Sequence, residues 1–361
     1  MDKGVRSNRG ADGVIARAAG TDGMSAAFDF KSARFIVPAL VLLFLALLPV
    51  YAAWINQPFY TTLFSRIMVY ALAGIALNFI LGFGGLVSFG HALYIGLGAY
   101  AVGILSFHGI TNGWLHLLAA LVICLVFATL IGAVVVRTGG MTFIMITLAF
   151  AQMGYFLAVS LKQYGGDDGL TIDARSNMGL FDLANNTVLY YFILISLVGA
   201  LWLFNRVLAA RFGFCLKGIK SNERRMLALG FPVFRYKLTA YVISALVCTL
   251  AGFFLANFTK FASPSYMQWS VSGELIVIIV LGGMSTQFGP IAGAIVFLLL
   301  EEVLQGWKPG IYPPFEELVN KHWQLVIGVF VILVVLYAKC GIYGYHQDHE
   351  HADHQLPMLV D

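Results

Sequence analysis

Long apolar runs constrain the fold of this chain more than any other feature. A helix that crosses the hydrocarbon core of a bilayer needs about 20 mostly apolar residues, because lipid offers its backbone no hydrogen-bond partner. Six runs meet this requirement clearly: 35–55, 115–136, 142–161, 187–208, 238–258 and 323–339. The composition agrees, since only 11% of the residues are charged, less than half of the roughly 25% usual in soluble domains. We therefore expect a membrane protein.

Further apolar runs are shorter or interrupted by glycine. Residues 66–82 and 91–108 are short, and glycines and a proline separate the run 271–285 from the run 291–305. Counting these runs separately brings the total to ten. The sequence therefore predicts an all-α polytopic membrane protein with about ten transmembrane helices, some broken or short, in one membrane domain over residues 35–342.

The positions of lysine and arginine predict the orientation of these helices. Both residue types resist translocation and stay on the cytoplasmic side, and they cluster in residues 1–34 and 206–237. Ten crossings place both clusters, and both termini, in the cytoplasm. The loop 209–237 then lies inside and the loop 162–186 outside. The net charge of +4 is too small and scattered to predict a nucleic-acid partner.

The two ends of the chain have different compositions from the membrane domain. Residues 1–34 are rich in Gly, Ala, Asp and Ser without a sustained apolar period, which predicts a disordered cytoplasmic arm. Residues 343–361 form a His-rich tail on the cytoplasmic side. Nothing fixes the geometry of these histidines, so we favour a disordered tail over a metal site.

The sequence lacks the common signatures of catalysis. ATP hydrolysis by this chain would need GxxxxGK[ST], whose backbone amides and lysine hold the phosphates, and the dipeptide Gly-Lys does not occur. HExxH and GxSxG are also absent. We therefore expect no enzyme activity and no cofactor, and any ATP-driven role would need separate ATPase subunits.

The basic stretch 209–237 is the most informative polar segment. Ser221 or Asn222 can cap a short helix whose first turn holds Glu223, and Gly230 would end that helix. One interpretation is a loop lying along lipid headgroups. The other is a docking helix, whose exposed apolar face is framed by charges for a soluble partner.

Two glycine-rich segments, Gly82–Ala92 and Gly282–Ala294, interrupt predicted spans with a similar pattern. Each has paired glycines, a hydroxyl residue and then Phe-Gly. Broken membrane helices are tolerated where protein or a water-filled cavity satisfies the freed backbone. We therefore hypothesise that the two breaks are equivalent parts of an internal repeat framing one pathway. Gly98 fits this pathway or simple helix packing equally well.

Ionisable groups within membrane spans are costly and make functional candidates. His91 opens a span beside the first break, and Glu274 begins the span before the second. For His91 a hydrogen-bonded structural role is the favoured interpretation. Glu301 and Glu302 lie near the outer end of their span, where we expect them to reach water.

Four blocks in order resemble one family, the M-type membrane subunits of branched-chain amino-acid ABC transporters, over about residues 60–342. The blocks are Leu77-Asn78 with Gly85 to Ala92 and Gly96 to Tyr100; Gly165 to Leu170; Ile219 to Glu223 with Ala228 to Gly230 and Tyr236 to Leu238; and Leu281 to Met284 with Phe288 to Ala294. Each block alone is weak evidence, whereas four in order are specific. Two segments depart from the family pattern: the stretch Arg224-Arg225-Met226, where smaller residues are usual, and the single residue Phe89, where leucine is common.

The resemblance implies a multi-pass permease subunit in a bacterial inner membrane. It would work with a second homologous permease subunit, two cytoplasmic ATPases and an extracytoplasmic solute-binding protein, and would translocate a branched-chain amino acid. The expected ATPase-coupling residues are Ser221, Asn222, Glu223, Ala228, Leu229, Gly230 and Phe231. The expected pathway residues are Gly84, Gly85, Ser88, Gly90, His91, Gly98, Glu274, Gly282, Gly283 and Thr286.

Three alternatives stay open from the sequence. Permeases for urea or short amides carry much the same blocks. An ion-coupled secondary transporter would need a buried carboxylate or histidine for its coupling cation, and only His91 and Glu274 offer themselves. An intramembrane enzyme acting on lipid is the third, and the shortage of acid–base pairs argues against it.

Overall fold

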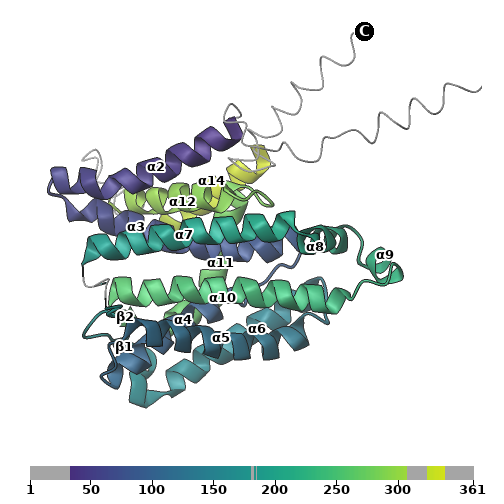
Figure 1. Cartoon of the computed structure of the whole chain (residues 1–361), viewed down its shortest axis with the longest axis horizontal. Helices are drawn as coiled ribbons and strands as arrows, with labels where there is room; N and C mark the ends of the chain where they lie inside the picture. The colour runs from purple at the N-terminus through teal and green to yellow at the C-terminus, as the bar shows by residue number, and fades with distance from the viewer. Residues whose placement is uncertain (1–32, 180–182, 184, 307–322, 338–361) are drawn as a thin grey trace, which may run out of the picture. The chain divides into compact units, whose positions relative to one another are not determined.

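The computed structural model describes residues 33–179, 183, 185–306 and 323–337 and is mostly helical (Figure 1). The helices are α2 (Ala33–Trp54), α3 (Pro58–Asn78), α4 (His91–Phe107), α5 (Gly113–Val135), α6 (Met141–Ser160), α7 (Asn186–Ala209), α8 (Arg211–Ser221), α9 (Glu223–Ala228), α10 (Val233–Thr259), α11 (Trp269–Gly282), α12 (Gly289–Gln305) and α14 (Trp323–Tyr337). The predicted tail 343–361 and residues 1–32 of the predicted arm lie outside the described residues.

Five helices in the described part of the chain are long and apolar enough to cross a membrane. They are Pro58–Phe83, Gly113–Val135, Met141–Ser160, Asn186–Ala209 and Val233–Thr259. Shorter apolar helices are Pro38–Trp54, His91–Phe107, Trp269–Gly282 and Gln324–Val334. Each apolar run expected from the sequence overlaps a helix, so the helical nature of these runs is confirmed.

Contacts divide the chain into the units Met1–Phe44 and Leu45–Asp361. Within the second unit, α10 packs against α3, α4 and α5 at the centre. A Cβ atom added to Gly98 on α4 would collide with the backbone carbonyl oxygen of Thr249 on α10, and one added to Gly252 would meet the carbonyl oxygen of Ile95. Glycines thus let these two helices approach at backbone distance. Gly98 therefore lies in a packed helix contact.

The structure corrects the expected span 66–82, which is not short. α3 begins at Pro58, a residue whose fixed φ and missing N–H suit the first turn, and continues through a π-helical turn, η1 (Phe79–Phe83). The polar residues of its first turns hid this start from the apolar pattern. The regular structure ends at Phe83, so the expected break at Gly84-Gly85 is present.

The all-helical expectation has one small exception. The loop after α6 contains two 3₁₀ turns, η2 (Lys162–Tyr164) and η3 (Gly166–Asp168), and then a two-residue strand, β1 (Leu170–Thr171). That strand pairs antiparallel with β2 (Phe261–Ala262), which follows α10.

The segment between α7 and α10 forms two helices, α8 and α9, where one compact helix was expected. α8 is amphipathic and buries Leu216 and Ile219, three residues apart, a period that the basic composition masked. The second helix, α9, matches the expectation. The side chain of Asn222 accepts a hydrogen bond from the backbone of Arg225, and the backbone amide of Phe231 donates to the carbonyl of Met226 to close the helix end. Figure 1 shows α8 and α9 at the opposite end of α10 from β1 and β2.

Candidate functional site

The two helix breaks lie against each other. The Ser285 hydroxyl, in the second break, donates to the carbonyl oxygen of Gly82 at the first break over 2.7 Å. Asn78, in the last turn of α3, donates to the carbonyl oxygen of Thr286 over 2.7 Å and accepts from the amide of Ser285 over 3.3 Å. Segments about 200 residues apart in sequence are thus joined through freed backbone groups, as broken membrane helices require.

A lysine from α8 contacts both breaks. The Lys220 ammonium donates to the carbonyl oxygen of Gly82 over 2.5 Å and to the Ser285 hydroxyl over 3.2 Å. The carbonyl of Gly82 stands near the C-terminus of α3 and η1, where the helix dipole favours a cation. The methylene chain of Lys220 also lies against Gly85, where a Cβ would approach its Cγ to 3.0 Å. Lys220 therefore joins the segment 209–237 to both breaks at once.

Two further contacts hold α8 and α9 to the membrane helices. The Lys217 ammonium lies 5.9 Å from the centre of the Phe83 ring in η1, within the range of a cation–π interaction. The Glu223 carboxylate, in the first turn of α9, pairs with the Lys237 ammonium at 2.7 Å, and the Lys237 side chain is only 7% exposed. The short helix α9 is thereby anchored to the first turns of α10.

The outer surface of α9 presents apolar side chains. Leu227 is 56% exposed, and Leu229, just after the helix, is 64% exposed. The expected ATPase-coupling residues, Ser221, Asn222, Glu223, Ala228, Leu229, Gly230 and Phe231, are all exposed. An exposed apolar surface framed by Arg224 and Arg225 is the arrangement that a docking helix needs.

His91 sits at the centre of a buried hydrogen-bond network. Its Nδ1 is 2.9 Å from the Ser88 hydroxyl and its Nε2 is 3.0 Å from the Ser244 hydroxyl. Because Ser244 donates to the carbonyl of Ala76, it accepts from Nε2, and Ser88, which accepts from the amide of Gly90, donates to Nδ1. Every polar atom of the neutral imidazole is satisfied, as the favoured structural interpretation of His91 predicts.

Backbone amides on both sides of the start of α4 are also occupied. The amide of Phe89 donates to the Thr147 hydroxyl on α6 over 3.2 Å, and the amide of Ala92 donates to the Ser272 hydroxyl on α11 over 2.9 Å. These hydroxyls come from distant helices and fix the position of the first break. In this conformation the amides of Phe89 and Ala92 are therefore not available to a solute.

The second break resembles the first in local geometry. Gly85 and Gly283 both have positive φ angles, 70° and 116°, which favour glycine. The Thr286 hydroxyl accepts from the amide of Gly289 at the start of α12, as the Ser88 hydroxyl accepts at the start of α4. Each following helix, α4 and α12, has 17 residues. These similarities agree with the repeat hypothesis.

The expected pathway residues fall into three groups. Most lie buried around the two breaks: Gly84, Ser88, Gly90, His91, Gly282, Gly283 and Thr286. Gly85 is exposed beside Lys220, and Gly98 lies in the contact of α4 with α10. Glu274 is half-buried on α11, two residues after Ser272, whose hydroxyl accepts from the amide of Ala92. The two breaks thus contact each other, whereas Gly98 lies in a separate helix contact.

One expectation about the charged residues is wrong. Glu301 does not reach water, because its residue is 8% exposed and its carboxylate pairs with the Arg66 guanidinium on α3 at 3.1 Å. The sequence placed Arg66 and Glu301 near the same side of the membrane. A cation and an anion at similar depth in two spans are a signal that they pair. Lys220 and Asn78 were also missed as site residues. Asn78 stands out as an amide side chain closing an apolar run.

Residues 59–336 match the family described as "Branched-chain amino acid transport system / permease component". The chain belongs to this family. Among curated proteins, this permease is 25% identical to the high-affinity branched-chain amino acid transport system permease protein LivM of Salmonella typhimurium, and 26% identical to LivM of Escherichia coli. Both alignments cover 86% of this chain and 78% of the relative. A probable LivM of Methanocaldococcus jannaschii is 21% identical, over 76% of this chain and 90% of the relative.

No solved structure matches the permease. The family match makes the chain a membrane transport subunit rather than an enzyme, and it confirms the expected resemblance. Neither a urea or amide permease nor an ion-coupled transporter is favoured by these comparisons, which all name branched-chain amino acid transport.

Proposed function

We propose that this permease is one membrane half of an ATP-powered importer for branched-chain amino acids. It works in a bacterial inner membrane with a second homologous permease subunit, two cytoplasmic ATPases and an extracytoplasmic solute-binding protein. About ten helices span the membrane, with both termini in the cytoplasm. The family match and the names of the relatives support this proposal.

The link from α8 to both helix breaks carries the proposal. ATPase subunits grip the exposed apolar surface around Leu227 and Leu229, and their closure moves α8 and α9. Because Lys220 bonds to Gly82 and to Ser285, that movement displaces both breaks together. The breaks then open and close a passage to alternating sides, with no covalent chemistry in this chain.

The proposed pathway passes the point where the two breaks meet. We assign to it the residues of the two breaks and of the start of α4, namely Gly84, Gly85, Ser88, Gly90, His91, Gly282, Gly283 and Thr286. The residues at this point are small, and backbone carbonyls here have no partner within a helix. A solute would therefore meet little steric hindrance once Lys220 moves away. In the described conformation hydrogen bonds close this point, as one end of an alternating-access cycle requires.

The deciding experiment measures leucine uptake by the complete importer in proteoliposomes. We expect uptake that requires ATP, stops with a non-hydrolysing ATPase subunit and persists after all ion gradients are collapsed. Unlabelled leucine, isoleucine and valine should compete, whereas urea and acetamide should not. Uptake that follows an ion gradient without ATP would contradict the proposal. Competition by urea but not by the amino acids would show that the importer carries urea and not branched-chain amino acids.

A further inference from the structure

The side chain of His91 joins three elements at the first break. The Ser88 hydroxyl, which belongs to the break, donates to its Nδ1 over 2.9 Å, and its Nε2 donates to the Ser244 hydroxyl on α10 over 3.0 Å. Ser244 in turn donates to the carbonyl oxygen of Ala76 on α3. Ser88, His91 and Ser244 are all 0% exposed. One buried chain of hydrogen bonds therefore connects the first break to α10 and, through α10, to α3.

A second polar contact holds α4 to α10 beside this chain. The Tyr94 hydroxyl on α4 donates to the Tyr241 hydroxyl on α10 over 3.0 Å. Both rings stand edge-on to the His91 imidazole, with 5.7 Å and 5.5 Å between ring centres. Tyr94 follows His91 by one helical turn, and Tyr241 precedes Ser244 by one. Because hydrogen bonds fix distance and direction, the start of α4 cannot shift relative to α10 without breaking them.

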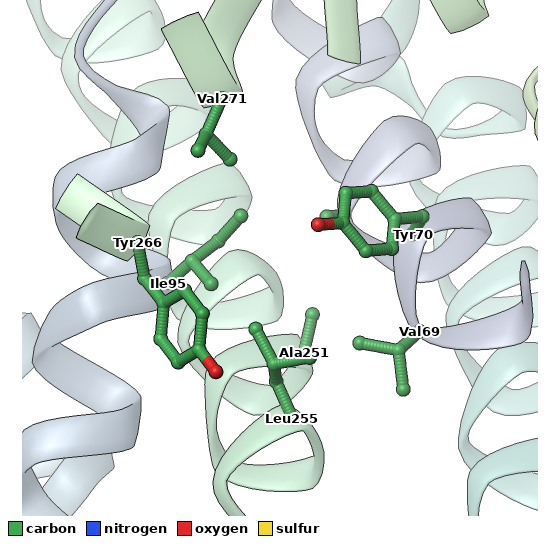
Figure 2. A pocket seen from close by; sticks show the side chains of 8 residues that line it. Val69, Tyr70, Ile95, Ala251, Leu255, Tyr266 and Val271 are labelled. Carbon is green, nitrogen blue, oxygen red and sulfur yellow. The ribbon is translucent and has the colours of Figure 1, made fainter. Parts of the chain in front are cut away.

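Farther from the breaks, the same three helices also meet through apolar side chains. Figure 2 shows Val69 of α3, Ile95 of α4 and Leu255 of α10 around a narrow gap. Apolar contacts are non-directional, so they tolerate small sliding movements that hydrogen bonds do not. The position of the break relative to α10 is therefore fixed at His91 and not in this apolar part of the contact.

The same face of α10 carries its connection to α9. Lys237, which pairs with Glu223 of α9 at 2.7 Å, precedes Tyr241 by four residues and Ser244 by seven. Residues at these spacings share one face of a helix, and all three are at most 5% exposed. Ser244 lies about 10 Å along α10 from Lys237, at 1.5 Å per residue. A displacement of α9 thus reaches Ser244 through two turns of one continuous helix.

We infer that His91 is a positioning residue that transmits movement of α10 to the first break. The inference rests on the proposed function and deepens it, because it gives the break a second connection to the segment that the ATPases contact. Lys220 holds the Gly82 side of the break to α8, and His91 holds the Ser88 side to α10. Closure of the ATPases then moves both ends of the break together.

The test follows the exposure of the first break while ATP binds. Position 87 is 37% exposed, so the Val87→Cys variant of the complete importer can react with a small thiol reagent in proteoliposomes. Mass spectrometry of the peptide that carries the introduced thiol gives the rate. We expect an ATP analogue that is not hydrolysed to change this rate at least fivefold. Adding Ser244→Ala, which removes the partner of His91 on α10, should reduce the change to less than twofold.

The matched control is Thr249→Val. It removes a hydroxyl from the same helix, but that hydroxyl donates to the carbonyl oxygen of Tyr94 on α4 over 3.2 Å and not to the break. This variant should keep the full response to the ATP analogue. In leucine uptake, Ser244→Ala should lower the maximum rate at least fivefold and leave the leucine concentration at half-maximal rate unchanged, because Ser244 positions the break without contacting solute. Thr249→Val should change neither.

The outcomes separate this inference from the proposed function. If the importer takes up leucine but Val87→Cys does not respond to the analogue, or if Ser244→Ala keeps the response, the role of His91 is overturned and the proposed function stands. Equal losses in Ser244→Ala and Thr249→Val would also overturn it, since they would show that only the packing of α4 against α10 matters. An importer without leucine uptake contradicts the proposed function itself.

A second variant decides if Ser244→Ala does not assemble. In His91→Asn the shorter side chain can still accept from Ser88 but cannot reach Ser244. We expect the same loss of the response to the ATP analogue and the same fall in the maximum rate of uptake. A full response in this variant would overturn the role of His91.

Discussion

At the breaks, the sequence predicted which kinds of residue occur and what they do, but not which residues contact each other. The glycine pattern predicted where the helices stop, and the burial cost of an imidazole predicted that His91 would be hydrogen-bonded. Nothing in the sequence joined Asn78 to Ser285 or Lys220 to Gly82, because these pairs are separated by more than a hundred residues. Only the folded chain brings the Lys220 ammonium to the carbonyl oxygen of Gly82.

At this scale we predict that Lys220→Met lowers leucine uptake at least tenfold. The change removes a charge-assisted hydrogen bond to Gly82, worth about 1.5–3 kcal/mol, and cuts the contact of α8 with both breaks. ATP hydrolysis should continue, so uptake per ATP hydrolysed falls. The measurement is parallel assay of leucine uptake and phosphate release in proteoliposomes.

The matched control is Lys217→Met, which removes the same charge from the same helix. Lys217 reaches the breaks only through the face of Phe83, an interaction worth about 0.5–1 kcal/mol at an exposed site. We therefore expect at most a threefold loss of uptake. Equal losses in the two variants would show that the charge of α8, and not the bonds of Lys220, is what matters.

Among the helices, α9 was predicted with its cap and its end, whereas α8 was missed. The signals for α9 are local, because Asn222 and Gly230 satisfy backbone groups within a few residues. The helix α8 buries Leu216 and Ile219, and it packs mainly against its sequence neighbours α7, α9 and α10. The start of α3 was missed because its first turn is polar and mostly exposed, so the apolar pattern does not extend to it.

For α9 we predict that Leu229→Asp reduces recovery of the ATPase with the purified permease at least fivefold. A charge at this 64% exposed position makes an apolar contact costly without disturbing any interior packing. Leu161→Asp, an exposed leucine after α6 at the other end of the bundle, is the control and should leave recovery unchanged. Co-purification of the tagged permease measures both, and full recovery with Leu229→Asp would contradict docking on this surface.

For the whole molecule, the helical class and the positions of the apolar runs were predictable, because lipid permits few other structures. The central place of α10 was not, since helix packing order depends on close contacts such as Gly98 with Thr249. The half-buried ion pair of Arg66 with Glu301 had a signal in the sequence, because both residues were placed near the outer side, but the sequence did not show that their two helices face each other.

The proposed orientation of the chain, with both termini in the cytoplasm, predicts a labelling pattern. An impermeant thiol reagent added to intact cells should leave Cys215 on α8 and an added Ser221→Cys unmodified, and should modify Lys162→Cys at the opposite end. Permeabilised cells should show labelling at Ser221→Cys, which is exposed. The natural Cys124 and Cys248 are buried and should give little background. Modification of Cys215 in intact cells would reverse the orientation.

The length of α10 has a consequence for communication between the two faces of the membrane. Its 27 residues extend about 40 Å at 1.5 Å per residue. At one end Lys237 is bonded to Glu223 of α9, and at the other β2 is paired with β1 of the loop after α6. In the proposed importer, this one helix therefore connects the end of the bundle that faces the solute-binding protein to the end that the ATPases contact.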